Sequence, residues 1–168
     1  MRVADDQRFV VDCEYSGETH ELISMAIVPL YRLEGFSIGR FEDPDREFYE
    51  VIEPLPKNLS PWVQENVVPH LKKPGISKVD FIRKLEEFML KHSVRELHYD
   101  WCDDIAYFNR FMVTGPGKRI RMAGPSLSHI HHPNITVQSA TPHNALEDAR
   151  GIAAAIRARF AGLEDVRR

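Results

Sequence analysis

The order of strand-like and helix-like segments is the feature that most constrains the fold of this chain. Residues 9–13 read FVVDC, residues 20–31 read HELISMAIVPLY and residues 47–52 read EFYEVI. Short runs rich in β-branched and aromatic residues, bounded by turn residues, are typical of strands. Ser16-Gly17 supplies a turn between the first two runs, so we expect a hairpin there. The run at 9–13 is apolar enough to be buried on both faces of a sheet.

Helical spacing dominates the rest of the chain. Ser60-Pro61 predicts the N-cap and first residue of a short helix. A longer helix is predicted at 77–92, with an apolar stripe formed by Val79, Ile82, Leu85, Phe88 and Met89. Two further helices are predicted at 105–112 and 143–160, and the last has an apolar stripe formed by Leu146, Ala149, Ile152, Ala153, Ile156 and Phe160.

Two short segments complete the predicted set of strands. Residues 95–101 predict a fourth strand and residues 135–138 a fifth, while 33–46 and 114–125 are expected to be loops. Three strands joined by turns and then strands alternating with helices indicate an α/β protein with one mixed five-stranded sheet flanked by helices. We see no linker or repeat, so residues 1–168 are expected to form one domain.

Composition excludes several classes of protein. The chain has 168 residues, of which 43% are hydrophobic and 28% charged, which argues against disorder. No run of about 20 apolar residues is present and the N-terminus lacks a secretory signal, so we expect a cytoplasmic protein that does not cross a membrane. Cys13 and Cys102 are expected to be free thiols. The net charge of −3 counts against a protein that binds nucleic acid by charge alone.

Asp12 and Glu14 are the first candidate site residues. Residues i and i+2 of a strand point to the same face, so both carboxylates are expected to project together from the first strand. Two carboxylates held that close repel each other unless a cation lies between them. Hard oxygen ligands suit Mg²⁺ or Mn²⁺. Taken alone, Asp-x-Glu is also a common end of a strand.

Three further aspartates follow the predicted fourth strand, at Asp100, Asp103 and Asp104. One of them is a candidate to complete a metal site from the neighbouring strand. The alternative is that Asp103 and Asp104 satisfy the free N–H groups at the start of the next helix. The spacing alone does not choose between the two interpretations.

His143 and Asp148 stand near the start of the last predicted helix. His143 is a candidate general base, because a histidine titrates near neutral pH. Asp148 is a candidate metal ligand one turn further along. Thr141 and Pro142 are expected to be the N-cap and first residue of this helix, with His143 and Asp148 in solvent as the alternative.

The combination of these motifs resembles the DEDDh exonucleases, also called the DnaQ-like group. The first motif of that family is matched by Val10-Val11-Asp12-Cys13-Glu14 and the third by His143-Asn144-Ala145-Leu146-Glu147-Asp148-Ala149. Residues 12–27 together with Glu47-Phe48-Tyr49 are similar to the small mycobacterial-type exoribonuclease-like branch. The resemblance extends from Phe9 to about Phe160 and is weakest at 30–46 and 114–134. It implies a ribonuclease-H-like fold.

The second motif departs from the family pattern, which usually reads His-Asn-Ala-x-Phe-Asp with an aromatic residue three positions later. If Asp104 is the motif acid, Tyr107 takes the aromatic position, but Tyr99-Asp100 stand where His-Asn is usual. We therefore predict Asp104 as the ligand and keep Asp103 and Asp100 in reserve.

The resemblance also implies a mechanism and a site. Asp12, Glu14, Asp104 and Asp148 would hold two Mg²⁺ or Mn²⁺ ions about 4 Å apart, with His143 as general base. Nucleoside 5′-monophosphates would be released from the 3′ ends of single-stranded RNA. Glu14 would also contact the 3′-terminal ribose, and a homodimer is compatible with the exoribonuclease branch. Besides Glu14 and His143, Tyr15 is a candidate substrate contact that stacks on the terminal base, although an ordinary turn aromatic is an equal alternative.

Other residues receive structural interpretations. Trp62 and Trp101 are expected in the core, and His129, His131 and His132 at the surface. Three alternative functions are kept: a 3′→5′ exodeoxyribonuclease, an inactive nucleic-acid-binding module of the same fold, and a non-enzymatic domain in which the motifs arise by chance.

Overall fold

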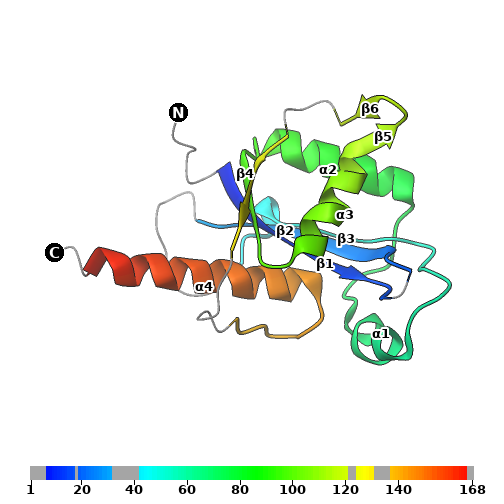
Figure 1. Cartoon of the computed structure of the whole chain (residues 1–168), viewed down its shortest axis with the longest axis horizontal. Helices are drawn as coiled ribbons and strands as arrows, with labels where there is room; N and C mark the ends of the chain where they lie inside the picture. Colours follow the sequence, from blue (N-terminus) through cyan, green and yellow to red (C-terminus); the bar gives the residue numbers. More distant parts are fainter. Residues whose placement is uncertain (1–6, 18, 32–41, 121–123, 131–136, 166–168) are drawn as a thin grey trace.

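Five strands form a mixed sheet in the centre of the protein (Figure 1). The computed structural model describes residues 7–17, 19–31, 42–120, 124–130 and 137–165. The second strand in the sequence pairs antiparallel with both the first and the third. The fourth strand pairs parallel with both the first and the last strand of the sheet. In spatial order the strands are β3 (Phe48–Val51), β2 (Leu22–Pro29), β1 (Arg8–Tyr15), β4 (Glu96–Tyr99) and β7 (Ser126–His129).

Helices cover both faces of the sheet. Two helices, α2 (Lys78–Lys91) and α3 (Cys102–Met112), lie on one face, and α4 (Ala145–Asp165) lies on the other (Figure 1). The smaller elements are α1 (Pro61–Asn66), the 3-10 helices η2 (Pro44–Arg46) and η3 (Val68–His70), and a hairpin of β5 (Val113–Gly115) and β6 (Lys118–Arg119). The predicted mixed five-stranded sheet flanked by helices is therefore confirmed.

The two faces of β1 belong to two different cores. Phe9, Val11 and Cys13 pack with residues of α2 and α3, whereas Val10 packs with residues of α4. This confirms that the first strand is buried on both faces, as its continuous apolar sequence predicts. Because side chains alternate along a strand, the even-numbered residues that follow Val10 project toward α4.

The pairing of β1 ends at different points on its two sides. Against β2 the register continues to Glu14 opposite Ser24 and beyond, but against β4 it ends where Val10 lies opposite His98. The chain leaves β4 after Tyr99 and enters α3 at Cys102. The C-terminal half of β1 is therefore open on the β4 side, and the start of α3 lies next to it.

The fifth strand is not the one predicted from the sequence. Residues 135 and 136 lie outside the described residues, Val137 and Gln138 are not in a strand, and the strand beside β4 is Ser126–His129. This segment has mostly exposed side chains and is placed by backbone pairing, so it carries little hydrophobic signal. The segment at 114–125, expected to be a loop, also includes parts of the β5–β6 hairpin.

Helix caps at α1 and α2 agree with the sequence. The Ser60 hydroxyl accepts from the Val63 N–H at 3.2 Å, and the Ser77 hydroxyl accepts from the Asp80 N–H at 3.1 Å. One residue of the predicted α2 stripe is wrong, because Val79 is 77% exposed. Phe81 is fully buried instead, with Leu85, Phe88 and Met89 as predicted.

The last two large helices begin at residues other than those predicted. Helix α3 begins at Cys102, so Asp103 and Asp104 lie inside its first turn. Helix α4 begins at Ala145, and Asn144 is its cap, because the Asn144 Oδ1 accepts from the Glu147 N–H at 3.2 Å. The prediction of a Thr141 cap with Pro142 as first residue is therefore wrong. Pro142 favours a helix start, but the Asn144 side chain, which also bonds two neighbouring segments, decides where the helix begins.

The described helices include none that is both long enough and apolar enough to cross a membrane. Cys13 and Cys102 are free thiols, as predicted.

Candidate active site

A cavity of about 620 Å³ opens at the C-terminal end of β1. We call it the carboxylate cavity, because five aspartate and glutamate side chains line it and no Lys or Arg does so among the described residues. Its lining is formed by Asp12, Cys13, Glu14, Tyr15, Gly17, Ser60, Trp62, Val63, Asp100, Trp101, Asp104, Val137, His143, Asp148 and Ile152.

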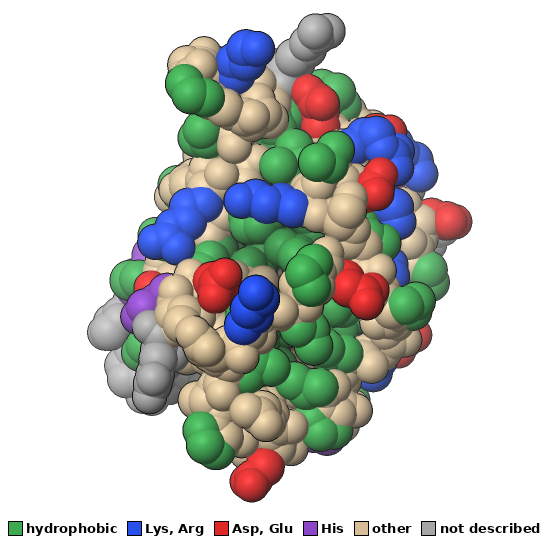
Figure 2. Space-filling model, turned by 90° about the vertical axis from the view of Figure 1, so that its right-hand side faces the viewer, with side chains coloured by type: hydrophobic (Ala, Val, Ile, Leu, Met, Phe, Trp, Pro, Cys, Tyr) green, Lys and Arg blue, Asp and Glu red, His purple; other side chains and the backbone are tan. Residues whose placement is uncertain are grey.

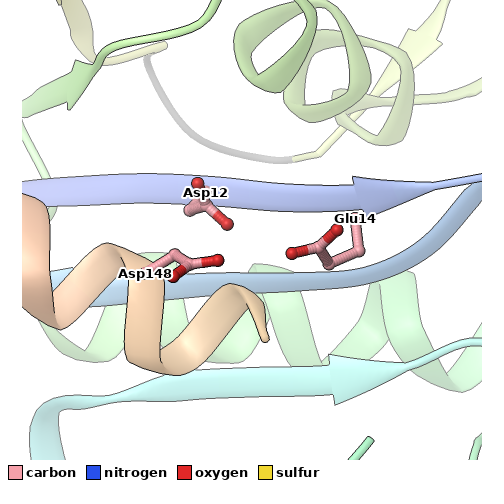
Figure 3. Close-up of side chains that lie close together, drawn as sticks. All are labelled: Asp12, Glu14 and Asp148. Atoms are coloured by element: carbon pink, nitrogen blue, oxygen red, sulfur yellow. The ribbon is translucent and has the colours of Figure 1, made fainter. Parts of the chain in front are cut away.

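One group of three carboxylates bridges β1 and α4. Asp12 and Glu14 project from the same face of β1 toward Asp148 on the first turn of α4 (Figure 3). Their nearest oxygens all lie within 4.8 Å of one another. Asp148 is held by the His143 backbone N–H, which donates to its Oδ2 at 2.9 Å. The i, i+2 spacing and the helix position predicted from the sequence thus bring these three side chains together.

A second group of three carboxylates shares Asp12 with the first. Asp12, Asp100 and Asp104 have ligand oxygens within 4.8 Å of one another. The Cys13 N–H, beyond the end of the β1–β4 ladder, donates to the Asp104 Oδ1 at 3.1 Å. The other oxygen of Asp104 is buried and has no hydrogen-bond partner within the described part of the chain. An unsatisfied buried carboxylate oxygen indicates a missing cation or donor at this position.

The three candidate aspartates of the second motif differ in where the structure places them. Asp104, the residue predicted from the sequence, joins Asp12 and is 2% exposed. Asp100, kept in reserve, joins the same group. Asp103 belongs to neither group. Residues 103 and 104 are neighbours on a helix and point in different directions, so only one of them can face β1.

Burial and mutual repulsion raise the pKa values of the carboxylates in the cavity. Burial, together with the charges of Asp104 and Glu14, raises the pKa of Asp12 well above its usual value. Burial and the adjacent Asp148 raise the pKa of Glu14 to about 8. The pKa of Asp104 is raised to about 8 by burial and the charge of Asp100. Such a site holds either protons or cations, because no basic side chain other than His143 lines it in the described chain.

His143 lies at the rim of the carboxylate cavity, two residues before α4. It is exposed and adopts a positive φ of 63°, a conformation uncommon for a residue other than glycine. Its ring meets the ring of Trp62 edge-on, with ring centres 4.8 Å apart. The sequence-predicted general base therefore faces the cavity from a backbone position that the cap of α4 and the Asp148 carboxylate define.

Two tryptophans were wrongly expected in the core. Trp62 is 52% exposed, Trp101 is 62% exposed, and both line the carboxylate cavity. Trp62 lies in the first turn of a helix of only six residues, after the Ser60 cap and Pro61. Trp101 is the residue before α3. Large exposed aromatic rings at a cavity are suited to stacking on flat ligands.

Tyr15 separates the carboxylate cavity from the next part of the surface. It lines the cavity, and its ring stacks on that of Tyr107 with centres 5.3 Å apart and an angle of 30° between the planes. On sequence grounds Tyr15 was equally a base-stacking residue or an ordinary turn aromatic. Its place at the cavity is compatible with the first role.

His129 is exposed, as expected of a surface histidine, and it pairs with the Asp100 carbonyl oxygen at 3.2 Å. His131 and His132 lie outside the described residues.

Comparison with protein-family models, with curated proteins and with solved structures finds no match to this chain.

Proposed function

We propose that this protein is a metal-dependent 3′→5′ exonuclease of the DEDDh type that removes nucleotides from the 3′ ends of single-stranded RNA. One observation carries the proposal: Asp12 belongs to two groups of three carboxylates in one cavity, with His143 at the rim. Sites with two divalent ions joined by a shared ligand are a recurrent arrangement for phosphodiester hydrolysis.

The donor set fits Mg²⁺ or Mn²⁺. All ligand atoms in both groups are carboxylate oxygens, and no thiol or imidazole belongs to either group. Glu14 and Asp148 would complete one ion site with Asp12, and Asp100 and Asp104 the other. Ions bound there would polarise the phosphodiester and make a bound water a stronger nucleophile.

The chain's own residues supply the remaining steps. His143 accepts the proton from the attacking water, a role that suits an exposed imidazole beside the carboxylates. Trp62 and Trp101 hold the terminal base by stacking. Stacking does not discriminate between the four bases, so it imposes no sequence preference. Glu14, which lines the cavity, contacts the ribose of the terminal nucleotide.

We infer that the fold is ribonuclease-H-like. The support is the mixed five-stranded sheet with helices on both faces, and the position of the carboxylates at the middle strand β1 and the adjoining helices. Fold analogy alone does not establish an activity, so the proposal rests on the carboxylate cavity.

The test is a product analysis on defined oligonucleotides. The protein is incubated with matched single-stranded RNA and DNA, each with a free or a phosphorylated 3′ end, and released products are identified by mass spectrometry. We expect nucleoside 5′-monophosphates from RNA with a free 3′ hydroxyl, in Mg²⁺ or Mn²⁺ and not in EDTA. The Asp12→Asn protein serves as the inactive control.

Each arm separates one alternative. Faster release from DNA would replace RNA by DNA as substrate while keeping the site. Internal cleavage products would contradict the exonuclease. Binding of the oligonucleotides without any product in either metal would indicate a binding module that has lost its chemistry.

A further inference from the structure

A second cavity, of about 520 Å³, lies beside the carboxylate cavity and differs from it in chemistry. Its floor is apolar and includes Leu22, Leu55 and Phe111, and its rim carries Lys57, Lys78 and Arg110. We call it the basic cleft. On the face shown in Figure 2, apolar side chains gather near the middle with Lys and Arg side chains beside them.

The three cations of the basic cleft are available to a ligand. Lys57, Lys78 and Arg110 are exposed, and none of them forms an ion pair with a carboxylate in the described part of the chain. The Lys78 Nζ lies 5.4 Å from the centre of the Phe111 ring, so its charge stands over the floor. Glu21 is the acidic residue in the lining, which leaves an excess of two positive charges (three minus one).

Aromatic rings connect the two cavities. Tyr15 lines the carboxylate cavity, and its ring stacks on Tyr107 at 5.3 Å and on His20 at 6.2 Å between ring centres. Both Tyr107 and His20 line the basic cleft. The Arg110 guanidinium lies 5.4 Å from the centre of the Tyr107 ring, and its Nη1 donates to the His20 carbonyl oxygen at 3.3 Å. Arg110 is therefore held at the point where the two cavities meet.

We infer that the basic cleft binds the nucleotides that precede the 3′-terminal one in a single-stranded substrate. A strand whose 3′ end lies in the carboxylate cavity passes over Tyr15 and continues into the cleft. Its bases contact the apolar floor, and its phosphates meet Lys57, Lys78 and Arg110. Grooves that combine cations with aromatic and apolar surfaces are the usual solution for single-stranded nucleic acid. This inference rests on the proposed function.

Single-stranded nucleic acid fits the basic cleft better than a small-molecule ligand of the size that the cleft could hold. A volume of about 520 Å³ also falls in the range of roughly 300–1,000 Å³ that is usual for small-molecule sites. A small uncharged ligand would not account for three cations on the rim, and the cleft adjoins a site proposed for a phosphodiester. The expected consequence is a preference for substrates longer than a dinucleotide.

The experiment compares kcat/KM for a dinucleotide and a heptanucleotide of RNA, each at two salt concentrations. The cleft variant carries Lys57→Ala, Lys78→Ala and Arg110→Ala. The control variant loses the same charge at Lys91, Arg95 and Lys118, which are exposed and line neither cavity. Because Arg110 also bonds His20, a double variant with only the two lysine substitutions is measured if thermal unfolding shows that the triple variant is destabilised.

We expect the wild type to have a higher kcat/KM for the heptanucleotide than for the dinucleotide. The kcat/KM of the cleft variant should be about tenfold or more below that of the wild type on the heptanucleotide, and within about twofold of it on the dinucleotide. For the heptanucleotide, the slope of log(kcat/KM) against log salt concentration becomes shallower by about 2, at roughly 0.7 for each phosphate contact removed. The control variant resembles the wild type. Equal losses in the cleft and control variants, or an equal loss on both substrates, would overturn the inference alone. If the wild type hydrolyses neither substrate, the proposed function fails as well.

Discussion

At the scale of single residues, Asp12 is the position on which both carboxylate groups depend. We expect Asp12→Asn to reduce exonuclease turnover below detection, because the amide weakens both groups at once. The neighbouring substitution Asp103→Asn is the matched control, since Asp103 belongs to neither group and should retain most of the activity. Measured side by side in Mg²⁺, equal activity in the two variants would contradict the assignment.

The second motif gives a separate prediction, because the structure brings two of its three aspartates to Asp12. Asp104→Asn is expected to cost more activity than Asp100→Asn. Asp104 is almost fully buried, whereas Asp100 is exposed and has room for water or a shifted side chain. The measurement is kcat for the two variants over a range of Mg²⁺ concentrations. A larger loss for Asp100→Asn would reverse their roles.

His143 is predicted to act on the rate and not on metal binding. His143→Ala should lower kcat by about 10²–10⁴, the usual contribution of general-base catalysis. The Mg²⁺ affinity of the His143→Ala protein should stay close to that of the wild type, because the substitution removes no carboxylate. Single-turnover rates and a calorimetric Mg²⁺ titration check the two parts. An unchanged rate would remove His143 from the mechanism.

At the scale of elements, the start of α4 is the most consequential detail. The Asn144 side chain accepts from the Glu147 N–H and donates to the His70 carbonyl oxygen at 2.7 Å and to the Tyr49 hydroxyl at 3.1 Å. This side chain therefore fixes the helix to β3 and to η3. His143 and Asp148 stand on either side of it, so the cap also sets their geometry.

Asn144→Ala is expected to lower the free energy of unfolding by about 2–4 kcal/mol, from a lost cap and two lost hydrogen bonds. The activity should fall with it. Ser77→Ala removes the cap of α2 and serves as the control, with a loss of about 1 kcal/mol and normal kcat. Thermal unfolding and kcat are measured on both proteins. Normal activity in Asn144→Ala would show that the cap does not position the site.

An element was predictable from the sequence where its own residues determine it, and not where contacts with distant segments do. Strand β1 carries a continuous apolar run, and α1 and α2 carry serine caps, so each was predictable from local residues. Strand β7 was not, because it is a mostly exposed edge strand held by backbone pairing to β4. The choice of Asn144 as the cap of α4 and the exposure of Trp62 depend on segments that are distant in the sequence.

The candidate site divides in the same way. The period of a strand places Asp12 and Glu14 together, and the helical pattern of the last segment places Asp148 in the first turn of α4. The position of His143 was not predictable in this way, because it lies before the helix with a positive φ. The choice among Asp100, Asp103 and Asp104 required the point where β4 ends and α3 begins, which a local pattern does not determine. Tertiary packing also decided that the tryptophans face the cavity.

At the scale of the whole molecule, the carboxylate cavity makes stability depend on pH. The pKa of Glu14 and that of Asp104 are raised to about 8 in the folded, metal-free protein, whereas unfolded carboxyls titrate near 4. Between these values the folded state binds more protons than the unfolded state. The stabilisation that these two carboxyls contribute is therefore fully present below about pH 4 and is lost as the pH rises through about 8.

We therefore expect the free energy of unfolding of the metal-free protein to fall between pH 5 and 8.5, by up to about 4 kcal/mol for each of the two carboxyls. Asp12→Asn should flatten this dependence and stabilise the metal-free protein at pH 8.5, because one repelling charge is removed. Urea unfolding in EDTA across the pH range gives both curves. A wild-type stability that rises with pH would contradict the raised pKa values.

Mg²⁺ or Mn²⁺ should restore the stability lost at high pH. A ligand that binds only the folded state adds RT ln(1 + [L]/Kd), which is about 2.7 kcal/mol at a hundredfold excess over Kd. The restoration should be absent in Asp12→Asn and present in Asp103→Asn. Equal stabilisation of all three proteins would indicate binding elsewhere on the molecule.

Metal-dependent hydrolysis of nucleic acid from the 3′ end is the activity proposed for the carboxylate cavity. A gel time course with 5′-labelled single-stranded RNA, run in Mg²⁺, in Mn²⁺ and in EDTA beside Asp12→Asn, tests it most directly. We expect a ladder that shortens by single nucleotides from the 3′ end in either metal, and intact RNA in EDTA or with the variant. Intact RNA in both metals, or a ladder that Asp12→Asn produces equally well, would contradict it.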